Sequence, residues 1–197
     1  VGRLLPWKHP EFMLTCAEAM EKRRIPFKII IIGDGEMKRK LQKYISAHQF
    51  KYGNIFLLGA VSASKISEYY IQSDVMVFPS DRREGWGAVL NEGMANGCIC
   101  LANREAGATN FLIQDGINGF SYGNLNEAIS KLAKIYFLKG TDTFDEISLA
   151  AQHTISNLWN YKVAGIRLAC VIRNICHREK WAGLYLTGPM SQQQSEE

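Results

Sequence analysis

The chain has 197 residues, which suits one domain, or one domain and part of another, and is long enough to bury an unaided hydrophobic core. A net charge of +4 gives no reason to invoke nucleic-acid binding, and no apolar stretch reaches the roughly 18 residues needed to span a bilayer. The five cysteines form no CxxC pair, which indicates reduced thiols in a cytosolic compartment rather than a disulfide framework.

The chain opens with VGRLL, which is typical of the end of a strand, so we expect a fragment of a longer protein. Short apolar runs then predict buried parallel strands at Lys28–Ile32, Asn54–Leu58, Asp74–Phe78, Cys98–Ala102 and, more weakly, Gly119–Tyr122. Stretches with helical periodicity lie between them, at Pro10–Lys22, Glu36–His48, Ser64–Ile71, Ala88–Asn96 and from the cap Asn124 to Leu138. This alternation predicts an α/β fold with a Rossmann-like, doubly wound parallel sheet, in which ligands bind beyond the carboxyl ends of the strands.

The pattern changes after about residue 140, where Asp145–Ser156 and Trp159–His177 predict two consecutive helices. We therefore divide the chain into a donor-binding domain (1–140), helices that pack on it or reach toward a missing partner domain (141–187), and a polar tail expected to be disordered (188–197). Cationic side chains interrupt the apolar sequence of the second helix. We expect the helix to pack with these charges at the rim of the contact, and the alternative is that the helix contacts a membrane surface.

Residues 84–92, EGWGAVLNE, carry the most informative chemistry. They follow an apolar run that ends in Pro79-Ser80, and two carboxylates, Glu84 and Glu92, bracket a Gly-Trp-Gly turn and the start of a helix. Backbone N–H groups of such a turn can bind phosphate, whereas carboxylates repel phosphate and accept hydrogen bonds from sugar hydroxyls. The combination predicts a site for a nucleotide-activated sugar. The alternative is two surface glutamates that stabilise a helix start.

Arg3 and Lys8 lie five positions apart in the loop that follows VGRLL. We predict that they clamp a diphosphate leaving group; the alternative is a solvated basic loop. The segment Gly33-Asp34-Gly35 lacks the third glycine of a dinucleotide fingerprint, because Lys38 stands there, so we exclude an NAD or FAD site. The four histidines show no metal-ligand spacing, and we interpret residues 142–145 as a loop and a helix cap rather than an Asp-x-Asp metal motif.

Five segments in register resemble the carboxyl-terminal half of the group 1 glycosyltransferases, a retaining family with the GT-B fold. They are GRLLPWK, IIIIGDGE, IFLLGAVS, DVMVFPSDRREGWGAVLNEGMANG and LIQDGINGFSY, and the resemblance covers about residues 1–138. The segment GWGAVLNE most resembles the corresponding segment of bacterial enzymes of capsule, O-antigen or exopolysaccharide assembly.

The resemblance implies a role for individual residues. Arg3, Lys8 and Glu84 become the catalytic residues: the two cations match the pair that contacts the donor diphosphate, and Glu84 matches the residue that meets hydroxyls of the transferred sugar. Glu92 matches the glutamate that holds the ribose diol. The resemblance also implies donor-binding roles for the backbone at Gly85, Trp86, Gly87, Ala88 and Val89, and for Gly59 and Val61 near the nucleobase.

The resemblance further implies the donor-binding half of a retaining hexosyltransferase that uses a UDP- or GDP-sugar and a glycan or lipid-linked acceptor. The expected setting is surface polysaccharide synthesis in the cytoplasm, at the inner face of the membrane, with the full-length protein peripherally associated. No cofactor or metal is expected. The amino-terminal acceptor domain is expected to be missing, so this fragment alone is expected to be inactive. The alternatives are a nucleotide-sugar epimerase of related fold and a non-catalytic nucleotide-sugar-binding module.

Overall fold

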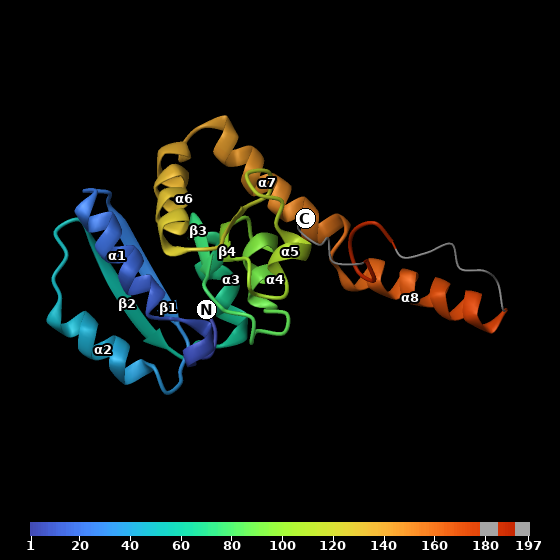
Figure 1. The fold of residues 1–197 in the computed structure, drawn as a ribbon, viewed down its shortest axis with the longest axis horizontal. Helices are drawn as coiled ribbons and strands as arrows, with labels where there is room; N and C mark the ends of the chain where they lie inside the picture. The colour runs from blue at the N-terminus through green and yellow to red at the C-terminus, as the bar shows by residue number, and fades with distance from the viewer. Residues whose placement is uncertain (178–184, 192–197) are drawn as a thin grey trace.

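The structure, a computed structural model, describes residues 1–177 and 185–191. Its strands form two parallel sheets (Figure 1). One sheet joins β1 (Phe27–Ile32) to β2 (Gly53–Gly59), and the other has the order β3 (Val75–Phe78), β4 (Ile99–Asn103), β5 (Phe120–Tyr122). All three strand pairs are parallel, which confirms the predicted α/β, Rossmann-like fold.

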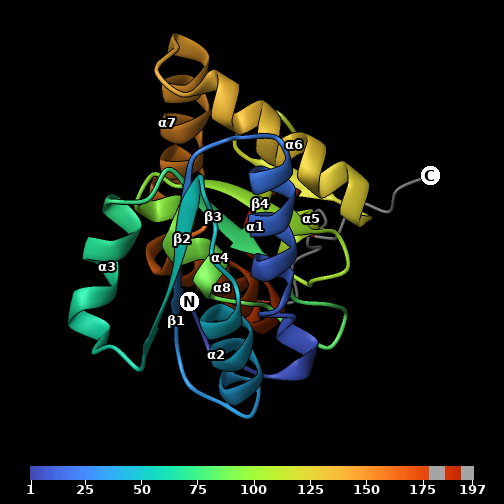
Figure 2. The same ribbon diagram turned by 90° about the vertical axis from the view of Figure 1, so that its left-hand side faces the viewer.

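Helices connect the strands and cover both sides of them. In chain order they are the 3₁₀ helix η1 (Pro6–Lys8), α1 (Phe12–Lys22), α2 (Lys38–Ala47), α3 (Ala63–Ile71), α4 (Val89–Ala95), α5 (Thr109–Leu112) and α6 (Leu125–Leu138). In Figure 2, α3 lies on one side of the strands and α1 and α6 lie on the other. The predicted cap at Asn124 is confirmed, since its side chain accepts a hydrogen bond from the Glu127 amide.

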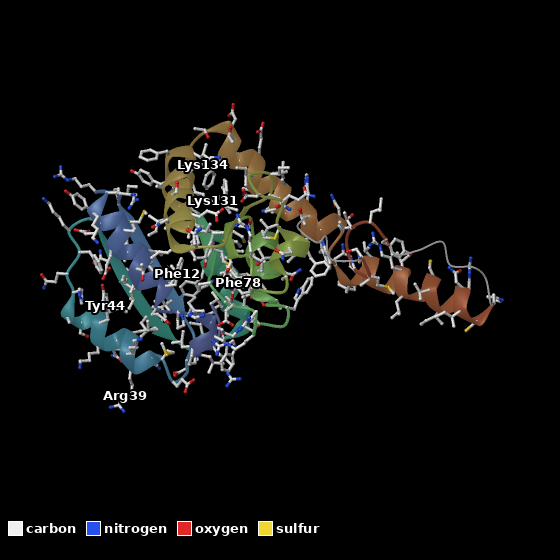
Figure 3. All side chains as sticks on the ribbon, viewed as in Figure 1. Phe12, Arg39, Tyr44, Phe78, Lys131 and Lys134 are labelled. Atoms are coloured by element: carbon white, nitrogen blue, oxygen red, sulfur yellow. The ribbon has the colours of Figure 1, made fainter. Side chains whose placement is uncertain are left out.

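Alternate residues of β4 point into two different core clusters. Ile99 and Leu101 pack with residues of α6, while Cys100 and Ala102 pack with residues of α4. All four are fully buried, as expected for a strand that is apolar on both faces. Phe12 of α1, labelled in Figure 3, stacks on Tyr122 with ring centroids 5.4 Å apart and ties α1 to the three-stranded sheet.

The first four residues run beside the end of β1 without forming an assigned strand. The Gly2 amide donates to the Ile32 carbonyl and the Leu4 amide to the Asp34 carbonyl, both at 2.9 Å. A β-carbon on Gly33, whose φ is +142°, would lie 1.8 Å from the Gly2 carbonyl oxygen. Glycine at position 33 therefore lets the backbone of residues 2–4 lie close to that of residues 32–34. This contact brings Arg3 and the loop after it to the carboxyl end of β1.

The carboxyl-terminal helices differ in their packing. α7 (Asp142–Asn157) buries Ile147 and Ala151, whereas α8 (Tyr161–Cys176), which we expected either to pack on the sheet or to reach toward a partner domain, has no buried residue and extends away from the sheets (Figure 1). Residues 142–145 are not the predicted loop: they form the first turn of α7, because Thr141 supplies the cap.

The tail is only partly described. Within residues 185–191, the carbonyls of Thr187 and Pro189 accept hydrogen bonds from the Arg167 guanidinium. The rest of the tail that we expected to be disordered, residues 192–197, lies outside the described residues. Among the helices of the described chain, none is long and apolar enough to cross a membrane.

Candidate functional site

Lys8 and Glu84 meet at the carboxyl end of β3, although 76 positions separate them in the sequence. The Lys8 ammonium forms an ion pair with Glu84 Oε2, and the Ser80 hydroxyl donates to the same oxygen at 3.2 Å. The two charged side chains are only 22% and 14% exposed. The structure therefore brings together two of the residues that the sequence predicts to act together.

The 3₁₀ helix η1, which carries Lys8, is fixed to the loop after β3 by further contacts. The Asp81 amide donates to the Trp7 carbonyl at 3.0 Å, and His9 Nε2 lies 2.9 Å from Asp81 Oδ2. Hydrogen bonds from Arg83, and then from His9, hold the pKa of the Asp81 carboxyl well below its usual range. Asp81 thus remains an ionised acceptor that anchors the basic loop.

The turn at residues 85–87 depends on Gly87, whose φ is +86° and whose added β-carbon would lie 2.2 Å from Cζ of Phe78. The carbonyls of Glu84 and Trp86 accept hydrogen bonds from the amides of Gly107 and Ala108. By contrast, within residues 1–177 and 185–191 no partner is recorded for the N–H groups of residues 85–88. Backbone N–H groups without a partner in the protein are candidate donors to an anion.

The Trp86 side chain anchors this turn to the protein. Its indole Nε1 donates to Asn91 Oδ1 at 2.8 Å, and its ring lies 5.2 Å from the Trp159 ring and 5.5 Å from the Phe111 ring. The ring thus belongs to an aromatic cluster that holds the turn in place.

Glu92 lies one turn further along, in the first turn of α4, where the Tyr70 hydroxyl donates to its Oε2 at 3.2 Å. Glu92 therefore lies at the start of the helix that directly follows the turn at residues 85–88.

The other predicted residues lie along the same edge of the strands. Arg3 is exposed and has no ion pair or side-chain hydrogen bond among the residues that the structure describes. Gly59 ends β2 with a φ of +74°, and its carbonyl accepts a hydrogen bond from the Gly33 amide at 2.8 Å. Half-buried Val61 follows in the loop before α3. Gly59 and Val61 thus lie at the carboxyl end of β2, whereas the Lys8–Glu84 pair lies at the carboxyl end of β3, in the other sheet.

A cavity of about 410 Å³ separates the two sheets. Its lining is mostly apolar, with residues such as Ile29 and Ile31 of β1 facing Met76 and Phe78 of β3. An anionic ligand would lose its hydration in such an interior, so the cavity itself does not suit a diphosphate. Polar residues of the site also line it: Arg3, Lys8, Tyr70 and Ser80.

Sequence reasoning missed several of these contacts. Tyr70, Ser80 and the His9–Asp81 pair were not among the predicted site residues, and only the position of Ser80 at a strand end was a signal. Within the described part of the chain no group of three or more His, Cys, Asp or Glu side chains could hold a metal ion.

The sequence is similar to those of known glycosyltransferases. The family model described as "Glycosyl transferases group 1" matches residues 1–143. An uncharacterised glycosyltransferase of Methanocaldococcus jannaschii is 28% identical over 137 residues, which are 68% of this chain and 36% of that protein. A lipopolysaccharide 1,2-N-acetylglucosaminetransferase of Salmonella typhimurium is 26% identical over 125 residues, 60% of this chain and 32% of that protein. The chain thus spans about a third of the length of these curated relatives.

Solved structures share the fold. The crystal structure of HepE from Anabaena in complex with UDP superposes with a TM-score of 0.71 at 22% identity, and the match covers 88% of this chain and 48% of that one.

Proposed function

The chain belongs to the group 1 glycosyltransferase family, and from this premise we propose that it is the donor-binding part of a retaining hexosyltransferase that uses a UDP- or GDP-sugar. The observation that carries the proposal is the meeting of Lys8 and Glu84 beside the open N–H groups of residues 85–88, with Glu92 one turn beyond. Cationic, carboxylate and backbone-donor groups are the partners that a diphosphate and a hydroxylated sugar need.

Each group has a proposed task. Glu84 accepts hydrogen bonds from hydroxyls of the transferred sugar, and Glu92 accepts them from the ribose diol. The backbone of residues 85–89 receives the phosphates, while Gly59 and Val61 border the nucleobase. Arg3 and Lys8 stabilise the negative charge that grows on the departing diphosphate.

The ion pair between Lys8 and Glu84 resolves an electrostatic conflict. A carboxylate close to a diphosphate would repel it, but the ammonium of Lys8 beside Glu84 attracts the diphosphate and offsets that repulsion. In this proposal two cations and the start of α4 perform the electrostatic task that a metal performs elsewhere, so no metal is required. The acceptor attacks the face from which the leaving group departs, as retention demands.

We propose a glycan or a lipid-linked sugar as the acceptor, in synthesis of a surface polysaccharide. The name of the Salmonella relative, a lipopolysaccharide N-acetylglucosaminetransferase, supports this setting. A lipid-linked acceptor is held in the membrane, so the full-length protein would act in the cytoplasm at the inner membrane face, and the acceptor would bind to a domain outside this chain.

A titration of this chain with UDP and with GDP tests the donor site. We expect one nucleotide to raise the melting temperature, because a ligand at 100 times its dissociation constant adds about 2.7 kcal/mol of stability. Replacing Glu92 by Ala should weaken binding of that nucleotide by about 1–3 kcal/mol, measured by calorimetry, since the ribose hydroxyls lose their acceptor. The matched control is Glu146→Ala on α7, which should bind as the wild type does. Unchanged affinity in Glu92→Ala would refute the ribose role.

A further inference from the structure

Each of the two glutamates of the site accepts a hydrogen bond from a buried hydroxyl. Tyr70, 3% exposed, donates to Oε2 of Glu92 at 3.2 Å, and Ser80, 2% exposed, donates to Oε2 of Glu84 at 3.2 Å. The two hydroxyls come from different elements: Tyr70 lies in the last turn of α3, and Ser80 follows β3.

The arrangement leaves one oxygen of each carboxylate available. In the described residues, Oε1 of Glu84 and Oε1 of Glu92 accept no recorded hydrogen bond, whereas both Oε2 atoms are engaged. A carboxylate that is held through one oxygen presents the other in a defined direction.

The Tyr70 hydroxyl is a fixed donor. The tyrosine packs in the core cluster with Met94 and Cys98, and its carbonyl accepts a hydrogen bond from the Cys98 thiol at 3.2 Å. Burial first, and then the neighbouring charge of Glu92, raises the pKa of Tyr70 well above its usual value, so the phenol stays protonated. Glu92 itself is exposed, and without this contact its flexible side chain would sample several rotamers.

We propose that Tyr70 and Ser80 are positioning residues, which hold Glu92 and Glu84 so that their free oxygens face the ribose diol and the transferred sugar. The inference rests on the proposed function, and it adds two residues that do not touch the ligand. Its physical basis is preorganisation: a carboxylate that is already restrained loses less side-chain entropy when the ligand binds.

The test for Tyr70 uses Tyr70→Phe, which removes the hydroxyl and keeps the buried ring. Binding of UDP and of 2′-deoxy-UDP to this chain is measured by calorimetry, or GDP and 2′-deoxy-GDP if GDP is the nucleotide that binds. We expect Tyr70→Phe to weaken binding of the ribonucleotide about tenfold, equivalent to about 1.4 kcal/mol, and to weaken binding of the deoxynucleotide less. The preference for the ribonucleotide should therefore fall.

Two controls separate positioning from a general structural effect. Tyr69→Phe, at the neighbouring half-buried tyrosine of α3, should leave both affinities unchanged. In a Glu92→Ala background, Tyr70→Phe should cause no further loss, because the carboxylate on which the hydroxyl acts is gone. An unchanged ribose preference in Tyr70→Phe, or an equal loss in the Glu92→Ala background, would overturn the role of Tyr70.

Ser80→Ala gives the corresponding test for Glu84. We expect it to weaken binding of UDP-glucose or UDP-N-acetylglucosamine, or of GDP-glucose if GDP is the nucleotide that binds, while the affinity for the nucleotide alone stays the same. Equal losses for UDP and the nucleotide sugar, or no loss for either, would contradict positioning of Glu84. The proposed function is tested separately, by wild-type binding: a wild type that binds neither UDP nor GDP would remove both proposals.

Discussion

The turn that presents the backbone donors of residues 85–88 depends on one missing β-carbon. Gly87 has a φ of +86°, and an alanine there would bring its methyl group to 2.2 Å from the buried Phe78 ring. We expect Gly87→Ala to lower the free energy of unfolding by about 2–4 kcal/mol, the sum of a strained backbone and an overpacked core. Urea denaturation measures the change.

The chain offers a matched control two positions earlier. A β-carbon on Gly85 would meet nothing within 4 Å, and the φ of Gly85 is not positive. Gly85→Ala should therefore leave stability within about 0.5 kcal/mol of the wild type. Equal stability of the two variants would show that this turn does not need its glycine.

For individual residues, the sequence predicts which chemical groups form the site better than it predicts which residues contact each other. The spacing of Glu84 and Glu92 around a glycine turn is local, so it can be read directly. Tyr70 lies 22 positions from Glu92, and His9 lies 72 positions from Asp81. Such pairs form only when separate elements pack together, and no local pattern indicates which tyrosine or histidine will take part.

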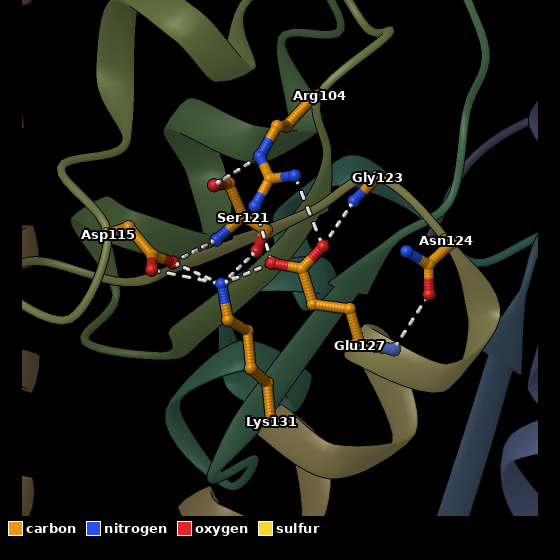
Figure 4. A network of polar contacts seen from close by, with 7 residues as sticks. All are labelled: Arg104, Asp115, Ser121, Gly123, Asn124, Glu127 and Lys131. Atoms are coloured by element: carbon orange, nitrogen blue, oxygen red, sulfur yellow. Dashed lines mark hydrogen bonds and ion pairs between the residues drawn. The ribbon is translucent and has the colours of Figure 1, made fainter.

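A network of charges joins β5, the loop before it and the start of α6 (Figure 4). Glu127 accepts hydrogen bonds from Lys131, the Gly123 amide and Arg104, and Lys131 also pairs with Asp115. Lys131 first, and then the Gly123 amide and Arg104, lower the pKa of the Glu127 carboxyl from 4.5 to about 2. The ionised form of Glu127 therefore stabilises the fold.

This shift predicts how stability depends on pH. Because the pKa of Glu127 is lowered in the folded state, its contribution is full above pH 4.5 and is lost as the pH falls towards 2. We expect Glu127→Gln to lower the free energy of unfolding by about 1–2 kcal/mol at pH 7, and this difference from the wild type to shrink below pH 4.5. Chemical denaturation at several pH values measures it, with exposed Glu146→Gln as the control. A difference that stays constant down to pH 2.5 would contradict the role of the network.

At the scale of elements, hydrophobic periodicity predicts most of what the structure shows. The run at Lys28–Ile32 becomes β1 (Phe27–Ile32), and the segment Ser64–Ile71 becomes α3 (Ala63–Ile71). The exception at residues 142–145 has a local cause, since the sequence leaves open whether Thr141 or a later residue caps α7. The division into two sheets was not predicted, because strand pairing depends on which edges meet in space.

At the scale of the whole molecule, α8 stands apart. Its residues Ile166, Leu168, Ile172 and Ile175 are each at least 51% exposed, and the helix extends away from the sheets in Figure 1. The periodicity of the sequence predicts a helix here, but it does not predict what the helix packs against. An apolar face indicates burial and does not identify the surface that covers it.

The length of the chain bears on whether it can transfer a sugar by itself. The chain contains all the residues proposed to bind the donor. It spans about a third of the length of the curated relatives that it matches, and none of its predicted site residues is assigned to the acceptor. Transfer requires that donor and acceptor be held together, since their orientation supplies much of the rate enhancement. We therefore expect this chain to bind UDP or GDP but to form no glycoside when a nucleotide sugar and lipid-linked or glycan acceptors are supplied. Product analysis by mass spectrometry, with a full-length enzyme as the positive control, measures transfer. Glycoside formed by this chain alone would show that both substrates bind within it.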